Sequence, residues 1–326
     1  MQYSTLNSGY KIPRIGLGTY QIKQTEAKQA IIDAIDVGYR HLDLAEMYDN
    51  QSQVGEAFRE VFASGKVKRE DLWITSKLWN TDHHPEHVEA ACLKTLNDLQ
   101  VIKYLDLYLM HWPLCFIHDG KSYFPRDSEG RIIYDPNPVP LSVTWEAMEQ
   151  LVDKGLVHSI GVSNVPESLL NDLWSTARIK PAVNQIELHI FLQQPRLINF
   201  CANLGVHVTA YVPIARAGQG TIARQGSEQQ EGDRDRVNIY KNSTIIRIAQ
   251  KYKKTEVQIA LRFLMQWGKG ENISAIPKTV HKERMAENFN IFDFELDEQD
   301  MKDLEQVDEN ARLSSGIIKF GIKGFD

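Results

Sequence analysis

The chain has 326 residues, 25% of them charged, and a formal net charge of −6, so it lacks the excess of positive charge that attracts nucleic acids or anionic membranes. No apolar run approaches the roughly 18 residues that a membrane-spanning helix needs. The 42% apolar content is enough for a substantial core, and the length fits either two ordinary domains or one large α/β barrel with insertions.

Short apolar strands alternate with amphipathic helices along the chain, a pattern typical of parallel strands joined by helical crossovers. Residues 1–14 carry Asn7-Ser8-Gly9 between two short extended pieces, which predicts a β-hairpin that plugs one end. The expected strands are residues 15–18, 39–43, 72–77, 104–111, 157–163, 182–187, 206–211 and 273–277. Eight such strands predict an α/β fold, a (β/α)8 TIM barrel that forms a single domain over residues 1–326.

The helix after the second strand has clear local signals. Asn50 is a candidate N-cap, Gln53 can complete a capping box, and Gly65 is expected to end the helix. The apolar residues between them recur at helical spacing, which indicates a core-facing helix. Further helices are expected at residues 85–99, 142–153, 166–174, 195–203, 244–252, 257–267 and 282–288.

Three stretches, residues 114–140, 214–242 and 309–326, are too long for simple connections. We expect them to leave the C-terminal face of the barrel, where long loops build the active site. The second stretch contains a glycine-rich segment at residues 218–223 that mimics a dinucleotide-binding fingerprint. It begins well after its strand and leads into polar residues, so we reject a Rossmann interpretation.

Three cysteines, Cys92, Cys115 and Cys201, are odd in number and lack metal-ligand spacing, which favours a reducing compartment. The first 15 residues also lack a basic segment followed by an apolar one. We therefore expect a cytoplasmic protein. Cys92 and Cys201 fall among apolar helix positions and are expected in the core, whereas Cys115 is not expected to be a nucleophile because no base is evident beside it.

Four residues with useful chemistry, Asp43, Tyr48, Lys77 and His111, fall at or just past the ends of successive strands. In the predicted barrel they face one pocket. Lys77, paired with Asp43, is expected to lower the pKa of Tyr48 from about 10 so that the phenol can protonate an oxygen. His111 would hydrogen-bond the same oxygen. Each residue alone also has an ordinary structural explanation.

These residues also carry a family resemblance. The segment Gly38-Tyr39-Arg40-His41-Leu42-Asp43-Leu44-Ala45, continuing through Tyr48, resembles the signature of the aldo-keto reductase superfamily. Other segments that match the family in order are Ser76-Lys77-Leu78-Trp79-Asn80, Leu109-Met110-His111-Trp112-Pro113, Gly161-Val162-Ser163-Asn164, Asn184-Gln185-Ile186-Glu187 and Ile276-Pro277-Lys278-Thr279. The resemblance covers essentially the whole chain and is closest to the aldose reductase-like branch.

The resemblance implies NADPH-dependent reduction of an aldehyde or ketone such as an aldose, with the proton coming from Tyr48, by a monomer that needs no metal. Asp43, Lys77 and His111 would complete the catalytic set. The implied residues for NADPH/NADP+ are Gly18, Thr19, Ser163, Asn164, Gln185, Tyr211, Lys278, Thr279, Arg284, Glu287 and Asn288. The implied substrate-binding residues are Tyr20, Trp79 and Trp112, with Tyr20 at a position where the family usually has Trp.

The choice between the two nicotinamide cofactors depends on Lys278 and Arg284. They follow the last strand, at the start of the last crossover helix, where this fold often binds phosphate. A 2′-phosphate favours an Arg fork and a Lys charge, whereas an unphosphorylated ribose favours an acidic partner. The basic pair therefore favours NADP(H).

Other interpretations remain open at this point. His83, His84 and His87 could hold a metal, although their acidic and proline neighbours favour an exposed helix start. A metal-dependent barrel hydrolase could use His41, Asp43, His111 and His189, but this would leave Tyr48 and Arg284 without a role. A third alternative is a catalytically silent NADP-binding protein with a structural or regulatory task.

Overall fold

A computed structural model describes residues 2–218, 237–267, 272–314 and 320. Eight parallel strands form one curled sheet and hydrogen-bond in chain order. They are β3 (Leu17–Gly18), β4 (His41–Asp43), β5 (Trp73–Leu78), β6 (Leu105–Met110), β7 (Val157–Ser163), β8 (Val183–Glu187), β9 (His207–Tyr211) and β10 (Ile273–Ala275). Ile15, just before β3, pairs in parallel with Ala275 of β10 and closes the ring. The predicted (β/α)8 architecture and all eight strands are confirmed.

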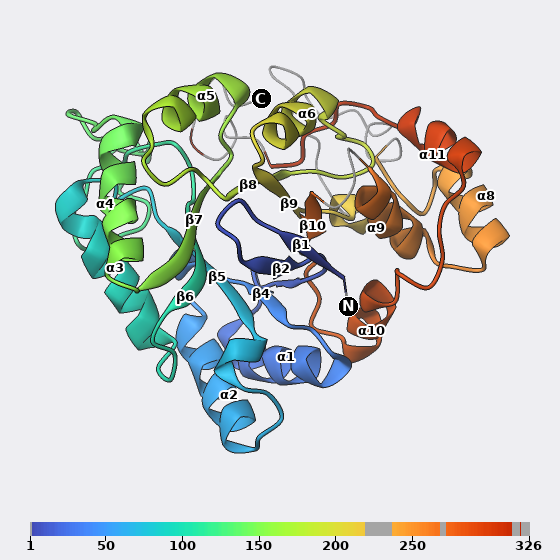
Figure 1. Ribbon diagram of the computed structural model, residues 1–326, viewed down its shortest axis with the longest axis horizontal. Coiled ribbons are helices and arrows are strands. Elements are labelled where there is room, and N and C mark those ends of the chain that lie inside the picture. The colour runs from blue at the N-terminus through green and yellow to red at the C-terminus, as the bar shows by residue number, and fades with distance from the viewer. Residues whose placement is uncertain (1, 219–236, 268–271, 315–319, 321–326) are drawn as a thin grey trace.

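Helices surround this ring on the outside (Figure 1). They are α1 (Gln24–Val37), α2 (Gln51–Ala63), α3 (Pro85–Asp98), α4 (Leu141–Asp153), α5 (Glu167–Thr176), α6 (Pro195–Asn203), α8 (Ser243–Tyr252), α9 (Glu256–Gln266), α10 (Lys282–Phe289) and α11 (Glu298–Glu305). The sequence did not lead us to expect α1 and α11. No side chain caps the start of α1, although its apolar face is buried, and α11 buries only Asp300 and Leu304.

Asn50 precedes α2 as expected, but the predicted capping role is wrong. Its side chain caps no backbone N–H of the helix. Its amide instead donates to the carbonyl oxygens of Thr19 and Ile22, at 3.1 and 3.0 Å. The start of α2 is thereby tied to the loop after β3, which is a tertiary contact that the local pattern did not reveal. Gly65 follows the helix with φ of +71°, a conformation that glycine adopts readily.

The N-terminal hairpin consists of β1 (Tyr3–Thr5) and β2 (Lys11–Pro13). It crosses the middle of the strand ring (Figure 1). Leu6 and Ile12 are buried and pack in one apolar cluster with inward-facing strand residues such as Trp73 and Leu107. The predicted plug is therefore confirmed, and it fills the end of the barrel where the strands begin.

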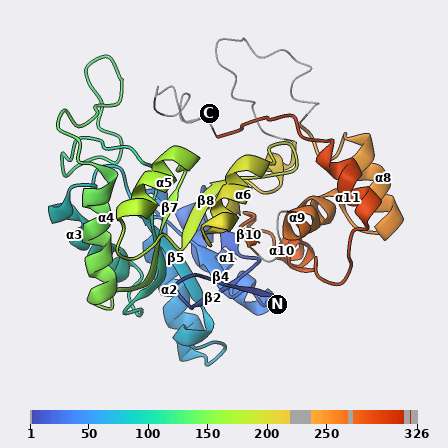
Figure 2. The same cartoon turned by 45° about the horizontal axis from the view of Figure 1, so that its top comes forward.

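The connection between β6 and α4, residues 114–140, rises on the side opposite the hairpin (Figure 2). This is the C-terminal face, as expected for a long connection in this fold. The glycine-rich segment at residues 219–223 and most of the 309–326 tail lie outside the described residues. Within the described ranges, no helix is both long and apolar enough to cross a membrane.

Candidate active site

The four residues singled out from the sequence meet at the C-terminal rim of the barrel. Asp43 ends β4 and Lys77 lies near the end of β5, while His111 directly follows β6. Tyr48 ends a short 3-10 helix, η1 (Glu46–Tyr48), on the loop after β4. Since β4, β5 and β6 are parallel neighbours, their carboxyl ends lie side by side and bring these side chains together.

A buried ion pair organises the group. The Nζ of Lys77 lies 2.6 Å from Oδ1 of Asp43 and 2.7 Å from the carbonyl oxygen of Leu44. Its distance to the Tyr48 hydroxyl oxygen is 3.3 Å. The other carboxylate oxygen, Oδ2 of Asp43, accepts a hydrogen bond from the Gln185 amide at 2.7 Å. Both charges of the pair are therefore compensated, which a buried pair requires.

The expected direction of the Tyr48 pKa shift is wrong. Burial raises the pKa of the Tyr48 phenol well above its ordinary value, and the negative charge of Asp43 acts in the same direction. Burial also lowers the pKa of Lys77, against the opposing effect of Asp43. Because Asp43 already pairs with the ammonium, the attraction of Lys77 does not offset these two effects. Tyr48 therefore holds its proton firmly and presents a neutral O–H.

Aromatic side chains stand around this group. The rings of Trp79 and Tyr48 meet the His111 imidazole edge to face, with centroids 4.9 and 5.9 Å away. Tyr20 lies beside Tyr48 at 5.1 Å and is 40% exposed, whereas Trp112 is buried. Tyr20 and Trp79 thus border the candidate site, and Trp112 packs in one apolar cluster with Trp79.

Five further aromatic residues pack in this wall, and no sequence motif singled them out. Phe116, Tyr123, Phe124 and Tyr134 come from the 114–140 connection, and Phe320 comes from the tail. The Trp79 Nε1–H donates to the Tyr123 carbonyl oxygen at 2.6 Å. The only available signal was the density of aromatic residues in two segments of unusual length.

The residues predicted to hold the nicotinamide form one hydrogen-bonded chain. The Tyr211 hydroxyl donates to Oδ1 of Asn164 at 2.7 Å, and the Asn164 amide donates to the His111 carbonyl at 3.0 Å. Ser163 donates from Oγ to the carbonyl oxygen of Gln185. Asn164 has φ of +61°, which Asn tolerates better than most residues. This chain links the ends of β7, β8 and β9 to His111.

Gly18 and Thr19 have structural roles in addition to any contact with a cofactor. A Cβ on Gly18 would lie 2.8 Å from the Ile276 carbonyl oxygen, so only glycine allows this approach of two strands. Thr19 is buried and donates from Oγ1 to the Asp43 carbonyl oxygen at 2.8 Å. It therefore fixes the backbone of the ion-paired aspartate.

The residues predicted to bind the adenosine end lie around the start of α10. Lys278 and Arg284 are exposed, whereas Thr279 and Asn288 are buried. The Glu287 carboxylate accepts a hydrogen bond from the Thr255 hydroxyl at 2.8 Å, so it is already engaged in joining α9 to α10. The two basic side chains are thus the accessible groups of this set.

Glu187 at the end of β8 belongs to a family motif, but the sequence indicated no role for it. Its buried carboxylate accepts hydrogen bonds from the backbone N–H groups of Leu313 and Ser314, at 2.6 and 2.8 Å, and lies 3.0 Å from His189. Burial opposes ionisation, but the contact with His189 and the N–H donors keep the pKa of Glu187 below its ordinary value. A charged group inside the barrel rim thus anchors the beginning of the tail.

Replacing Glu187 with Gln should loosen residues 313–314. The Gln amide has one oxygen and one NH2 group, so one of the two backbone N–H groups would face a donor instead of an acceptor. A buried donor left without an acceptor costs about 1–3 kcal/mol. Hydrogen exchange should report faster exchange at these two amides. Glu298→Gln is the control, since Glu298 is exposed and pairs with Lys302 on its own helix. Unchanged protection in Glu187→Gln would contradict the anchoring role.

The other interpretations of the histidines are not supported by the geometry. His83 is buried, so the expected exposed helix start is wrong for this residue, and burial lowers its pKa to about 3. Nδ1 of His41 lies 3.0 Å from the Pro13 carbonyl, near the hairpin. Among the described residues, His41, Asp43, His111 and His189 do not bring three ligand atoms together, which removes the basis for a hydrolase centre.

Comparisons with known proteins agree with this arrangement. The model of the Aldo/keto reductase family matches residues 14–309. The chain is 42% identical over 309 residues to the bovine "Aldo-keto reductase family 1 member A1", covering 94% of this chain and 90% of that protein. It is 39% identical over 321 residues to the zebrafish (Danio rerio) "member A1-A", covering 98% of this chain and 94% of that protein.

A solved structure is also similar. The aldose reductase of Schistosoma japonicum superposes with a TM-score of 0.87 at 38% sequence identity, covering 100% of this chain and 98% of that one. The ordered motifs, the closed barrel and these matches all point to the same conclusion. The chain belongs to the aldo/keto reductase family and is an oxidoreductase that acts on carbonyl compounds.

Proposed function

We propose that this protein reduces aldehydes and ketones to alcohols with NADPH, and that Tyr48 donates the proton. The observation that carries the proposal is the position of the Tyr48 hydroxyl, 3.3 Å from a lysine that is itself paired with Asp43. When bound, NADPH would supply the hydride. The protein's own residues must then hold the carbonyl oxygen and provide the second hydrogen.

The high pKa of Tyr48 suits this task. A neutral phenol is a hydrogen-bond donor toward a carbonyl oxygen, and it transfers its proton once that oxygen becomes a more basic alkoxide. The Lys77 ammonium lies beside the phenol oxygen and stabilises the negative charge that develops there during proton transfer. His111, whose imidazole meets the Tyr48 ring edge to face, would orient the same oxygen.

The residues fit NADPH by their chemistry. The amide and hydroxyl groups of Asn164 and Ser163 offer the donors and acceptors that a carboxamide head group needs. Tyr211, hydrogen-bonded to Asn164, offers an aromatic plane for a flat ring. Lys278 and Arg284, exposed at the start of α10, offer positive charge for a 2′-phosphate.

The aromatic wall favours small or aromatic aldehydes over bulky polar substrates. Trp79 and Trp112 are buried, and their indole rings offer apolar surface to a substrate. Tyr20 adds a hydroxyl where the family usually has an indole, which favours substrates with a polar substituent on that side. We further propose that the protein works in the cytosol as a monomer.

Mixing the protein with NADPH and either glyceraldehyde or 4-nitrobenzaldehyde tests the proposal directly. The near-ultraviolet absorbance of NADPH should fall in proportion to the alcohol formed. Tight NADPH binding without oxidation across a broad carbonyl panel would instead favour the silent cofactor-binding alternative. A chelator should not remove the reductase activity, because no step of the proposed reaction uses a metal.

Replacing Arg284 with Ala should weaken NADPH binding about 10- to 150-fold, because a charge-assisted hydrogen bond is worth roughly 1.5–3 kcal/mol. The affinity for NADH should change little. Lys282→Ala is the matched control, since Lys282 lies on the same helix turn and pairs with Asp33 and Asp36. Fluorescence titration of the unmodified protein and both variants with NADPH and with NADH measures these affinities. Equal losses for NADPH and NADH would contradict the 2′-phosphate assignment.

A further inference from the structure

A second cluster of reactive side chains lies outside the candidate active site. Nε2 of His84 lies 2.6 Å from Oδ2 of Asp135, and Sγ of Cys115 lies 3.7 Å from the same oxygen. One ligand atom from each of the three residues lies within 4.8 Å of the other two. His84 directly precedes α3, whereas the other two residues belong to the 114–140 connection.

We propose that His84, Cys115 and Asp135 bind one Zn²⁺ ion and thereby fasten the 114–140 connection to the start of α3. Imidazole, thiolate and carboxylate are the side chains that zinc uses in proteins, commonly with four ligands in a tetrahedron. A thiolate in the set selects zinc or cobalt over magnesium and calcium. His84 and Asp135 are partly exposed, so water can complete the tetrahedron.

The spacing is close to what the ion requires. Ligand atoms around a tetrahedral zinc lie roughly 3.3–3.6 Å apart, given bond lengths of about 2.0–2.3 Å. The distance between Cys115 Sγ and Asp135 Oδ2, 3.7 Å, lies just above this range. His84 Nε2 and Asp135 Oδ2 are now joined by a hydrogen bond, and their distance must increase by less than 1 Å for both atoms to bind the ion. A small side-chain rotation provides this increase.

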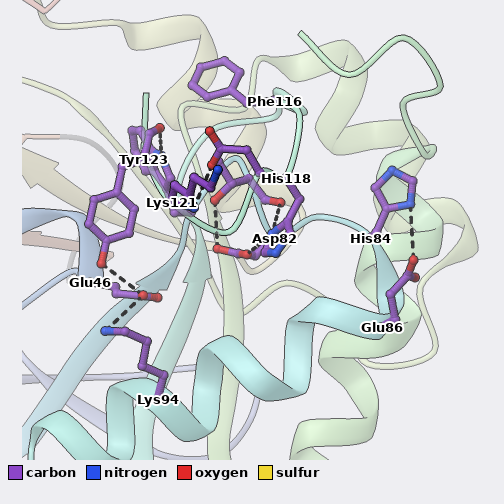
Figure 3. A network of polar contacts seen from close by, with 12 residues as sticks. Glu46, Asp82, His84, Glu86, Lys94, Phe116, His118, Lys121 and Tyr123 are labelled. Atoms are coloured by element: carbon purple, nitrogen blue, oxygen red, sulfur yellow. Dashed lines mark hydrogen bonds and ion pairs between the residues drawn. The ribbon is translucent and has the colours of Figure 1, made fainter. Parts of the chain in front are cut away.

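Surrounding groups already orient the ligands, as outer partners do at many metal sites. Oε1 of Glu86 lies 4.0 Å from Nδ1 of His84, whereas Nε2 of the same ring faces Asp135. Figure 3 shows this pair apart from the neighbouring group of Asp82 and His118. The Asn137 N–H donates to Oδ1 of Asp135 at 2.8 Å, which leaves Oδ2 directed at the other two ligands.

Cys115 and Asp135 are also held together through the backbone, because the Asp135 N–H donates to the Cys115 carbonyl oxygen at 3.1 Å. Of the three histidines near α3, only His84 is positioned to coordinate. His83 is buried away from solvent, and the His87 ring stacks on His118 with centroids 3.8 Å apart. The site therefore differs from a cluster of these three histidines, and it revises our expectation of no bound metal.

The cysteine ligand makes the proposed binding sensitive to pH. Zinc binds the thiolate form of cysteine, so the ion must displace the proton of the thiol. Binding should therefore release one proton from sulfur and become tighter as the pH rises.

The ion would act on the substrate side of the molecule. Cys115 is adjacent to Phe116, and the same connection carries Tyr123, whose carbonyl oxygen accepts the Trp79 N–H. Fastening the two ends of this connection should reduce the motion of the aromatic wall. We therefore expect zinc to change KM for aromatic aldehydes more than kcat, although this consequence depends on the proposed reductase function.

Titration of the untagged full-length protein with Co²⁺ tests the site itself, without any activity measurement. One Co²⁺ per chain should bind and produce a thiolate-to-cobalt charge-transfer band, and Zn²⁺ should displace it. Cys115→Ser should abolish the band, and Asp135→Asn should weaken Co²⁺ binding at least tenfold. His87→Gln, three residues after His84 in α3, is the matched control and should bind Co²⁺ as the unmodified protein does.

Two results would overturn the site. One is the absence of stoichiometric binding by the unmodified protein at micromolar metal. The other is an equal loss of Co²⁺ affinity in His87→Gln and in Cys115→Ser, which would indicate a different ligand set. Circular dichroism checks that each variant is folded. If Cys115→Ser does not fold, His84→Gln takes its place in the test. Since these readouts use no cofactor, they remain decisive whether or not the reductase proposal holds.

Discussion

Replacing Tyr48 with Phe is expected to lower kcat for carbonyl reduction about 10²- to 10⁴-fold, the usual contribution of a positioned general acid. The ring remains beside His111 and Tyr20, so the packing of the site is kept. NADPH affinity should therefore change by less than about twofold, a free-energy difference below 0.5 kcal/mol. Steady-state kinetics and fluorescence titration measure the two quantities on the same preparation.

Tyr20→Phe is the matched control, because it removes a phenolic hydroxyl from the neighbouring ring, 5.1 Å away. It should alter KM for some substrates but leave kcat within a few-fold. If Tyr48→Phe retained full turnover, another acid would have to donate the proton. If both variants lost turnover equally, the effect would arise from disturbed packing rather than from the missing donor.

The pH dependence of the unmodified protein checks the same assignment. Because burial raises the pKa of Tyr48, the phenol stays protonated at and above its ordinary value of about 10. A phenol with a raised pKa stays protonated, and can donate its proton, as the pH rises. Deprotonation of Tyr48 should therefore cause no decrease of kcat for reduction below pH 10. An alkaline loss centred near pH 8 that disappears in Tyr48→Phe would contradict the raised value.

The barrel and the meeting of the four residues could be predicted because both depend on short-range patterns. Parallel strands buried on both faces read as apolar runs, and their carboxyl ends share one rim. Asp43 and Lys77, at the ends of neighbouring strands, must therefore be close. Tyr48 lies only five residues after Asp43, so its position near the pair could also be predicted.

Long-range polar contacts could not be predicted in the same way. Gln185 bonds Asp43 although 142 residues separate them, and Asn50 bonds two carbonyl oxygens in another loop instead of capping its own helix. Both depend on which side-chain rotamer the packed structure selects. The pattern of residue types in the sequence contains no such information.

The pKa of Tyr48 was mispredicted for a related reason. The sequence revealed a lysine near a phenol, and proximity alone lowers a phenol pKa. The actual direction depends on how deeply the ring is buried and on how fully Asp43 already neutralises Lys77, at 2.6 Å. Both quantities are properties of the folded site and not of its residue list.

The second large effect is expected from the buried ion pair. Lys77→Met should reduce the free energy of unfolding by about 3–5 kcal/mol, because it leaves the Asp43 carboxylate buried without its cation. Asp43→Asn should cost less, since burial already lowers the pKa of Lys77 and the amine can lose its proton. Chemical denaturation of both variants, with and without NADPH, measures the difference.

The double variant Asp43→Asn/Lys77→Met separates stability from catalysis. Removing both charges should restore most of the unfolding free energy lost in Lys77→Met, because neither charge is then left unpaired. Turnover should stay low, since no cation remains beside the Tyr48 oxygen where negative charge develops. If the double variant recovered turnover together with stability, the pair would serve only to hold the strands, and Tyr48 would not depend on Lys77 for proton transfer.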